Sequence, residues 1–205
     1  SHSYTLDGIF RFPKSVSGVW SQFFDEVDMQ GTVNKYFIRW ASNPNSKYYS
    51  TISNGRLAGH TDPQIASMIV ESWKEKGRVA SENGTFMHRQ IELYLNCLES
   101  DETIVEMQQF KQFLSEVAIP RNYEPFRTEW SVFCERRGIA GQIDCIFKVV
   151  GSNEYHMVDW KRCAKPLDPG AGAHFRRYGR PPCHELLDNS FSHYACQQNL
   201  YAALL

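Results

Sequence analysis

Three strands are predicted in the second half of the chain by the pattern of apolar and polar positions. The first covers residues 128–134, where aromatic and branched side chains alternate with polar ones, as they do on a pleated surface. The second covers 140–150 and the third 155–160. Between them, the Gly-Ser-Asn sequence at 151–153 is typical of a hairpin turn. We therefore expect three strands joined by turns.

Apolar residues at helical spacing predict two helices before these strands. One opens at residues 60–63, where Thr61 or Asp62 serves as N-cap and Pro63 takes the first helical position, and it ends near Gly77. The other runs over 85–99, after a break at Asn83-Gly84. Further helices are expected at 19–24, 33–40, 103–117 and 191–205, and irregular connections at 43–49, 120–125 and 164–182.

The length of 205 residues favours one domain with a substantial core, made of a helical part at 1–80 and a motif-bearing core at 84–205. The net charge is −1, so any nucleic-acid contact must come from a local basic patch. No apolar run approaches the ~18 residues that cross a bilayer. The six cysteines form no C-x-x-C pair, which favours a reducing, intracellular setting and disfavours a zinc or iron–sulfur site.

Two carboxylates in the predicted strands are candidates for metal binding. Asp144 interrupts an apolar strand, and Asp159 ends the next one, two residues before Lys161. Residues i and i+2 of a strand share a face, and strand pairing can bring Asp144 beside them. Buried carboxylates need a partner, and Mg²⁺ and Mn²⁺ bind such oxygen ligands. The alternative is an ordinary Asp–Lys ion pair on a surface strand.

His88 and Glu92 lie four residues apart on one face of the helix predicted at 85–99. A histidine and a glutamate stacked on a mostly apolar face are unusual, which makes the pair a candidate functional feature. The alternative is a core histidine whose hydrogen bond is satisfied by the glutamate.

The connection at 164–182 carries three arginines, Arg176, Arg177 and Arg180, beside Phe175 and Tyr178. Arginines interleaved with aromatic side chains suit contacts with phosphates and stacked bases. A solvated loop without a ligand explains the same composition.

Taken in order, these features resemble the PD-(D/E)XK nuclease superfamily, and within it the RecB-like branch. That branch carries a G-T-x-x-H helix followed by a glutamate, then G-x-x-D, D-x-K and Q-x-x-x-Y. The matching segments here are GTFMH at 84–88 with Glu92, GQID at 141–144, DWK at 159–161 and QQNLY at 197–201. The resemblance implies an α/β (α+β) fold of the restriction-endonuclease type, with a mixed central sheet flanked by helices.

The resemblance also implies a ligand set for the metal. His88 would bind it through an imidazole nitrogen, and Asp144 and Asp159 through their carboxylates. The backbone carbonyl of Trp160 would be a further ligand. Glu92 would be a ligand or would hold His88 in place.

Other residues would act on the substrate. Lys161 would position the attacking water or stabilise charge, and Gln197 and Tyr201 would line the site and contact the substrate strand. Glu129 in the first predicted strand could also face the site.

The function implied is a Mg²⁺- or Mn²⁺-dependent deoxyribonuclease that hydrolyses phosphodiester bonds, as an exonuclease or on single strands. The expected partner is DNA, single-stranded or at its ends, with a helicase or replication protein as a further partner or fusion. No membrane partner is expected. Some relatives bind an iron–sulfur cluster through one cysteine before these motifs and three after them, a pattern that this sequence does not show.

Three other functions remain open from the sequence. Viral cap-snatching endonucleases share this fold and use a histidine with acidic ligands, so RNA is an alternative substrate. A non-catalytic nucleic-acid-binding module would keep the fold without the reaction, although the complete set of motif residues argues against it. A structural domain with no nucleic-acid role is the third.

Overall fold

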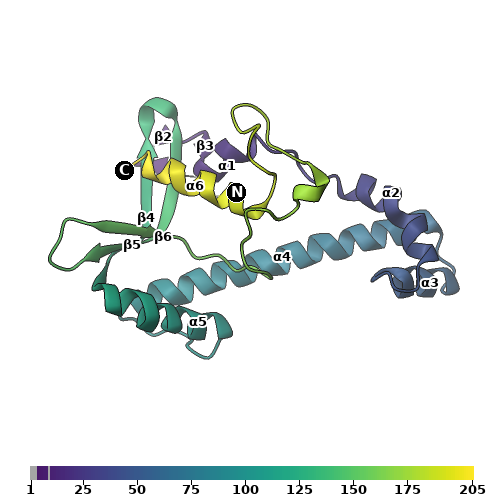
Figure 1. The fold of residues 1–205 in the computed structure, drawn as a ribbon, viewed down its shortest axis with the longest axis horizontal. Coiled ribbons are helices and arrows are strands. Elements are labelled where there is room, and N and C mark those ends of the chain that lie inside the picture. The colour runs from purple at the N-terminus through teal and green to yellow at the C-terminus, as the bar shows by residue number, and fades with distance from the viewer. Residues whose placement is uncertain (1–3, 9) are drawn as a thin grey trace. The chain divides into compact units, whose positions relative to one another are not determined.

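The fold is of the mixed α+β class (Figure 1). It is seen in a computed structural model that describes residues 4–8 and 10–205. The strands are β1 (Thr5–Leu6), β2 (Phe10–Arg11), β3 (Lys14–Ser15), β4 (Tyr123–Cys134), β5 (Ile139–Val149) and β6 (Tyr155–Val158). The α-helices are α1 (Val16–Ser21), α2 (Met29–Ser42), α3 (Tyr49–Leu57), α4 (Asp62–Leu95), α5 (Val105–Phe113) and α6 (Ser190–Ala202). A π-helical turn, Leu114–Ala118, continues α5, and short 3-10 turns lie at Ile119–Arg121, Glu135–Arg137 and Ala173–Phe175.

The chain packs as two compact units. Unit 1 combines the described residues up to Asp25 with Gly84–Leu205, and unit 2 is Glu26–Asn83. The sequence had assigned the first 80 residues to one helical part. The start of the chain instead belongs with the motif-bearing segment because β3 pairs with β5 and Val16 is buried against the sheet. Within the described residues, no helix combines the length and apolar character needed to cross a membrane.

The sheet of unit 1 is built around β5. Strand β4 runs antiparallel to it from Tyr123 opposite Val149 to Cys134 opposite Ile139, and so occupies one edge of β5. On the other edge, β3 pairs in parallel at Ile139 and Ala140, while β6 pairs antiparallel at 145–148. Residues 141–144 lie between these two short strands. This is the stretch that contains the G-Q-I-D motif.

Strand β5 is buried along most of its length. The side chains of Ile143, Cys145 and Phe147 are buried, and so are those of Asp144 and Ile146, which lie on the opposite face of the strand. A strand covered on both faces has no solvated side on which to place a charge. Asp144 is therefore a carboxylate inside the core, with 8% of the residue exposed.

Two groups of helices in unit 1 pack against β5: α1 with α6, and α5 with the end of α4 (Figure 1). Val16 of α1 and Tyr201 of α6 form one cluster with Ile143. Phe113 at the end of α5 contacts Phe147, and the C-terminal part of α4 packs on α5 through Met87 and other residues. The last turns of α4, which carry His88, are thus anchored inside unit 1.

Unit 2 consists of α2, α3 and the first part of α4 around its own core. That core contains Val33, Ile52 and Ile65 among its buried residues. Gly55 is needed where α3 meets α4, since an added Cβ would lie 2.8 Å from Cγ1 of Ile65.

The predicted break at Asn83-Gly84 is wrong. Helix α4 runs without interruption from Asp62 to Leu95 and replaces the two helices expected there. A glycine inside a helix costs about 1 kcal/mol of stability relative to alanine. The packing of the neighbouring helical turns can offset this cost. The helix ends four residues before Glu99, and Cys97 just beyond it adopts a left-handed conformation with φ 57°.

Further elements differ from the prediction, among them one strand and one helix. Strand β4 begins at Tyr123, inside the segment expected to be a connection, because pairing with the end of β5 extends it. Helix α3, Tyr49–Leu57, was not predicted, and it has little amphipathic pattern because glycine and polar residues interrupt it.

Candidate functional site

Three potential ligands converge where α4, β4 and β5 meet. Nδ1 of His88 lies 3.5 Å from Oδ2 of Asp144 and 3.8 Å from Oε1 of Glu129. One ligand atom from each of these residues lies within 4.8 Å of the others. An imidazole with two carboxylates at this spacing can hold a divalent cation between them.

The backbone holds Asp144 in place at the gap between β3 and β6. Its Oδ2 accepts a hydrogen bond from the backbone N–H of Trp160 at 2.7 Å. Burial raises the pKa of Asp144 to about 6, and the charge of Asp159 adds to this shift against the opposing effects of His88 and Lys161. A buried carboxylate with a raised pKa gains from a nearby cation, so this environment favours metal binding.

Glu129 enters the site through an unusual backbone conformation. The pairing of Thr128 with Cys145 and of Trp130 with Ile143 places Glu129 opposite Asp144. Its φ is +45°, a left-handed value that is rare for a non-glycine residue and costs about 1–3 kcal/mol. Strain of this kind is often found at functional sites. The sequence had raised Glu129 only as a further residue facing the site.

The charge on His88 depends on these carboxylates. Burial lowers the pKa of His88, but the carboxylate of Glu129 and the charge of Asp144 outweigh it, so that the pKa is raised overall. The positive charge of Lys161 opposes the rise. His88, Glu129, Asp144 and Lys161 therefore form one interacting set of charges.

Asp159 lies next to this set, just after β6, and pairs with Lys161. Nζ of Lys161 is 2.5 Å from Oδ2 of Asp159, whose side chain is only 8% exposed. The other carboxylate oxygen, Oδ1, is buried and has no hydrogen-bond partner among the described residues. An unsatisfied buried carboxylate oxygen is costly, and a bound cation is one group that would satisfy it.

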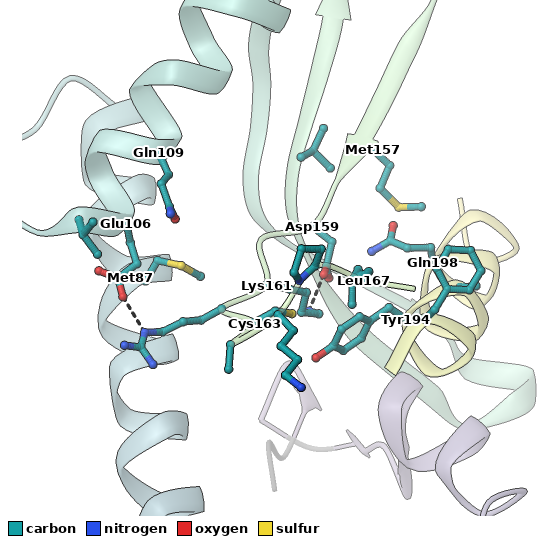
Figure 2. A pocket seen from close by; sticks show the side chains of 18 residues that line it. Met87, Glu106, Gln109, Met157, Asp159, Lys161, Cys163, Leu167, Tyr194 and Gln198 are labelled. Atoms are coloured by element: carbon teal, nitrogen blue, oxygen red, sulfur yellow. Dashed lines mark hydrogen bonds and ion pairs between the residues drawn. The ribbon is translucent and has the colours of Figure 1, made fainter. Parts of the chain in front are cut away.

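A cavity of about 1160 Å³ opens beside Asp159 and Lys161 (Figure 2). Met87, which precedes His88 in α4, lines it, as do Tyr194 and Gln198 from α6. The basic residues Lys161, Arg162 and Lys165 contribute to its wall. The cavity is large enough to admit part of an extended polymer beside Asp159.

Tyr194 is a site residue that the sequence analysis missed. Its ring lies beneath Nζ of Lys161, 5.3 Å from the ring centroid, and its hydroxyl points toward Cys163 in Figure 2. Burial raises the pKa of Tyr194, and the neighbouring Cys163 and Asp159 add to the shift. Its spacing in α6, three residues before Gln197 and seven before Tyr201, is the signal that could have found it.

Gln197 and Tyr201 lie together, but Tyr201 is part of the core. Nε2 of Gln197 donates to the Tyr201 hydroxyl at 3.3 Å, and only 5% of Tyr201 is exposed. Burial raises the pKa of the Tyr201 hydroxyl to about 12. The ring packs on Gly141, where an added Cβ would lie 2.5 Å from Cε1 of Tyr201. Gly141 of the G-x-x-D motif thus leaves room for the ring of Tyr201 from the Q-x-x-x-Y motif.

Glu92 is not in the His88 cluster. Its carboxylate pairs with Arg89 at 2.7 Å, three residues earlier on α4, instead of joining Glu129 and Asp144. The 100° rotation per residue puts His88 and Glu92 on one side of the helix, but only His88 reaches the sheet.

The arginines of the 164–182 connection are exposed, and two of them already have partners. Arg177 pairs with Asp188 at 2.8 Å and Arg180 with Asp25 at 2.9 Å, while Arg176 has a left-handed φ of 50°. Arg177 and Arg180 therefore attach the 164–182 connection to Asp188 and Asp25, which both belong to unit 1.

Comparisons of the chain with protein families, with curated proteins and with solved structures find no match.

Proposed function

We propose that the chain is a divalent-metal-dependent nuclease of the PD-(D/E)XK type, related to the RecB-like branch, and that unit 1 is its restriction-endonuclease-like core. The observation that carries the proposal is the meeting of His88, Glu129 and Asp144 beside the Asp159–Lys161 ion pair. These residues come from four separate segments of sequence. Their convergence, with Asp159 and Lys161 in the wall of a cavity, supports a common task.

The donor set fits Mg²⁺ or Mn²⁺. The carboxylates of Glu129, Asp144 and Asp159 supply hard oxygen ligands, and the imidazole of His88 favours Mn²⁺ among oxygen-ligated cations. The unpartnered Oδ1 of Asp159 and the raised pKa of Asp144 both suit a bound cation. Such a cation supplies Lewis-acid chemistry and lowers the pKa of water at the site.

Lys161 is the residue best placed to act on the reacting phosphate. Its ammonium group is paired with Asp159 and rests on the Tyr194 ring, at the wall of the cavity. From there it can orient a water by hydrogen bonding and stabilise negative charge that develops on phosphate oxygens. Lys165, also in the wall, adds positive charge along the path of a bound strand.

DNA is the proposed substrate, as single strands or at duplex ends. The alternative is RNA, because a histidine with acidic ligands also suits the RNA endonucleases of this fold. Labelled oligonucleotides of matched sequence in DNA and RNA form, each in single-stranded and duplex states, separate these two substrates. Cleavage is measured with Mg²⁺, Mn²⁺ or EDTA, and labels at either end report polarity or internal cutting.

The essential variant is Asp159→Asn, and Asp168→Asn in the exposed 164–182 connection is its matched control. We expect metal-dependent cleavage by the wild type and by the control, and none by Asp159→Asn. Equal cleavage by all three proteins would contradict the proposal. Binding of DNA without cleavage in either metal, by protein shown to be folded, would favour a non-catalytic binding module instead.

A further inference from the structure

Unit 2 contains a segment with an unusual distribution of charge. Between Asp28 and Asp62 the chain has no acidic residue, but it has four basic ones, Lys35, Arg39, Lys47 and Arg56. The whole protein, by contrast, has a net charge of −1. Helices α2 and α3 and their connection therefore form a local basic segment, which is the kind of patch through which a chain of this overall charge can bind a polyanion.

The positive charges of this segment are mostly uncompensated. Lys35, Arg39 and Lys47 are exposed, and none of them forms an ion pair within the part of the chain that the structure describes. Only Arg56 is neutralised, by Asp62 at 2.8 Å. The three free charges lie on α2 and on the connection to α3.

Helix α4 in the same unit behaves differently. Its exposed charges neutralise one another, as Lys74 does with Glu71 at 2.6 Å and Arg78 with Glu75 at 2.6 Å. Arg78 also pairs with Glu82. Unit 2 thus has one helix whose charges are largely satisfied internally and one segment whose charges remain available to a ligand.

Three partly exposed aromatic side chains lie among the free charges. Tyr36 and Trp40, one turn apart on α2, are stacked with an interplanar angle of 25° and centroids 5.9 Å apart. Tyr48 continues the row, with its centroid 4.4 Å from that of Trp40. Trp73 of α4 holds Tyr48 in place by donating a hydrogen bond to its hydroxyl at 2.8 Å.

The lysines are interleaved with these rings. Nζ of Lys35 lies 5.4 Å from the centroid of Tyr36, and Nζ of Lys47 lies 4.8 Å from that of Tyr48. Arg39 follows Lys35 by four residues, so both project from the same side of α2. The result is a continuous surface of Lys35, Tyr36, Arg39, Trp40, Lys47 and Tyr48, which we call the α2–α3 surface.

We propose that the α2–α3 surface binds a single strand of nucleic acid. Alternating cations and aromatic faces match the alternating phosphates and bases of an unpaired strand, where each base stacked on a ring contributes about 1–3 kcal/mol. A duplex would use the cations and leave the rings without bases, because its bases are already stacked on one another. The surface lies wholly within unit 2, whereas the proposed catalytic residues all lie in unit 1.

The experiment measures binding of a fluorescein-labelled oligothymidylate of about 20 nucleotides by anisotropy, in EDTA so that cleavage does not contribute. The test variant is Lys35→Glu with Lys47→Glu. Its matched control is Lys74→Glu with Lys76→Glu, which makes the same change in net charge on α4 of the same unit. We expect affinity to fall about tenfold or more in the test variant and less than about threefold in the control.

Two further measurements separate specific contact from general charge attraction. The slope of log affinity against log salt should shrink by about 0.7 for each lost phosphate contact in the test variant. Tyr36→Ser, which removes one ring and no charge, should weaken binding to the single strand without weakening binding to a duplex of the same sequence.

Three results would overturn this proposal. The affinity for the oligonucleotide could fall equally in the test and control variants, or folded wild-type protein could fail to bind it. The protein could also bind anionic phospholipid vesicles and not the oligonucleotide. The proposed nuclease activity does not enter the measurement. Asp159→Asn should retain full binding through the α2–α3 surface even though it abolishes cleavage, so failure of either proposal can be told from failure of the other.

Discussion

The backbone N–H of Trp160 donates a hydrogen bond to Oδ2 of Asp144, at 2.7 Å. This bond ties the segment after β6 to the centre of β5, and it thereby sets Asp159 and Lys161 beside Asp144. The Trp160 ring anchors the segment on its other side, with centroids 5.3 Å from both Phe110 and Phe113. The relation between the two motifs is therefore fixed by one hydrogen bond and by aromatic packing, and it does not depend on a long paired strand.

Lys161→Met should strongly reduce cleavage and leave metal binding intact. Methionine retains much of the length of the side chain but has no charge, so water and phosphate lose their cationic partner while the carboxylates remain. We expect cleavage to fall by about 10²–10³-fold. Single-turnover cleavage and Mn²⁺ titration of the same preparation measure the two properties. Loss of Mn²⁺ binding together with cleavage would show that Lys161 acts on the metal site as a whole.

Tyr194 should matter for cleavage through its ring, which supports the Lys161 ammonium group. Tyr194→Phe keeps the ring and should retain most activity, whereas Tyr194→Leu removes the cation–π contact, worth about 0.5–2 kcal/mol, and should lower kcat by about tenfold. KM should change little if the ring positions the lysine. A similar loss in both variants would assign the effect to the hydroxyl group.

Gly141→Ala should destabilise the protein, because its new Cβ would lie 2.5 Å from Cε1 of Tyr201 and 2.7 Å from Cγ2 of Val16. Overpacking of this kind costs about 1–3 kcal/mol. Gly84→Ala is the matched control: no heavy atom outside its own helix lies within 4 Å of an added Cβ. It should stabilise α4 by up to about 1 kcal/mol. Urea unfolding of both variants checks the two signs, and equal effects would contradict this packing.

The stability of the metal-free protein should depend on Asp144 and on pH. The pKa of this carboxyl is raised from 3.8 to about 6 in the folded state, so folding takes up a proton between these values. Stability from this group is therefore present below pH 3.8 and is lost as the pH rises through about 6. The full loss is up to about 3 kcal/mol.

Asp144→Asn removes this ionisation and retains an oxygen to accept the Trp160 N–H. In EDTA the variant should be more stable than the wild type at pH 8 and about equally stable at pH 4, as measured by urea unfolding. A stabilisation that does not change with pH would exclude ionisation of Asp144 as its source.

The pattern of apolar, polar and turn residues along the chain predicted several elements of unit 1 correctly. The strand β5, the turn after it and the helix α6 were all predicted from the sequence. Gly84 was misread as a break because a single glycine has the same local preference whether tertiary packing continues the helix or not. Helix α4 continues because its two ends are each packed in a core, one in each unit.

The site was harder to predict where it depends on register or on rare conformation. Glu129 faces Asp144 only because of the pairing of β4 with β5 and its own left-handed φ, and neither is encoded in a short motif. Glu92 shares a helix side with His88 but pairs with Arg89, a choice that the four-residue spacing does not reveal. Tyr194 lacked a motif of its own, although its spacing in α6 placed it near Gln197.

Calorimetric titration of Mn²⁺ tests the proposed metal site most directly, with wild type, Glu129→Gln and the exposed control Glu116→Gln. We expect saturable binding to the wild type and to the control, and at least about tenfold weaker binding to Glu129→Gln, because one of the clustered carboxylates is lost. Equal affinity in all three proteins, or no saturable binding by folded wild type, would contradict a metal site at His88, Glu129 and Asp144.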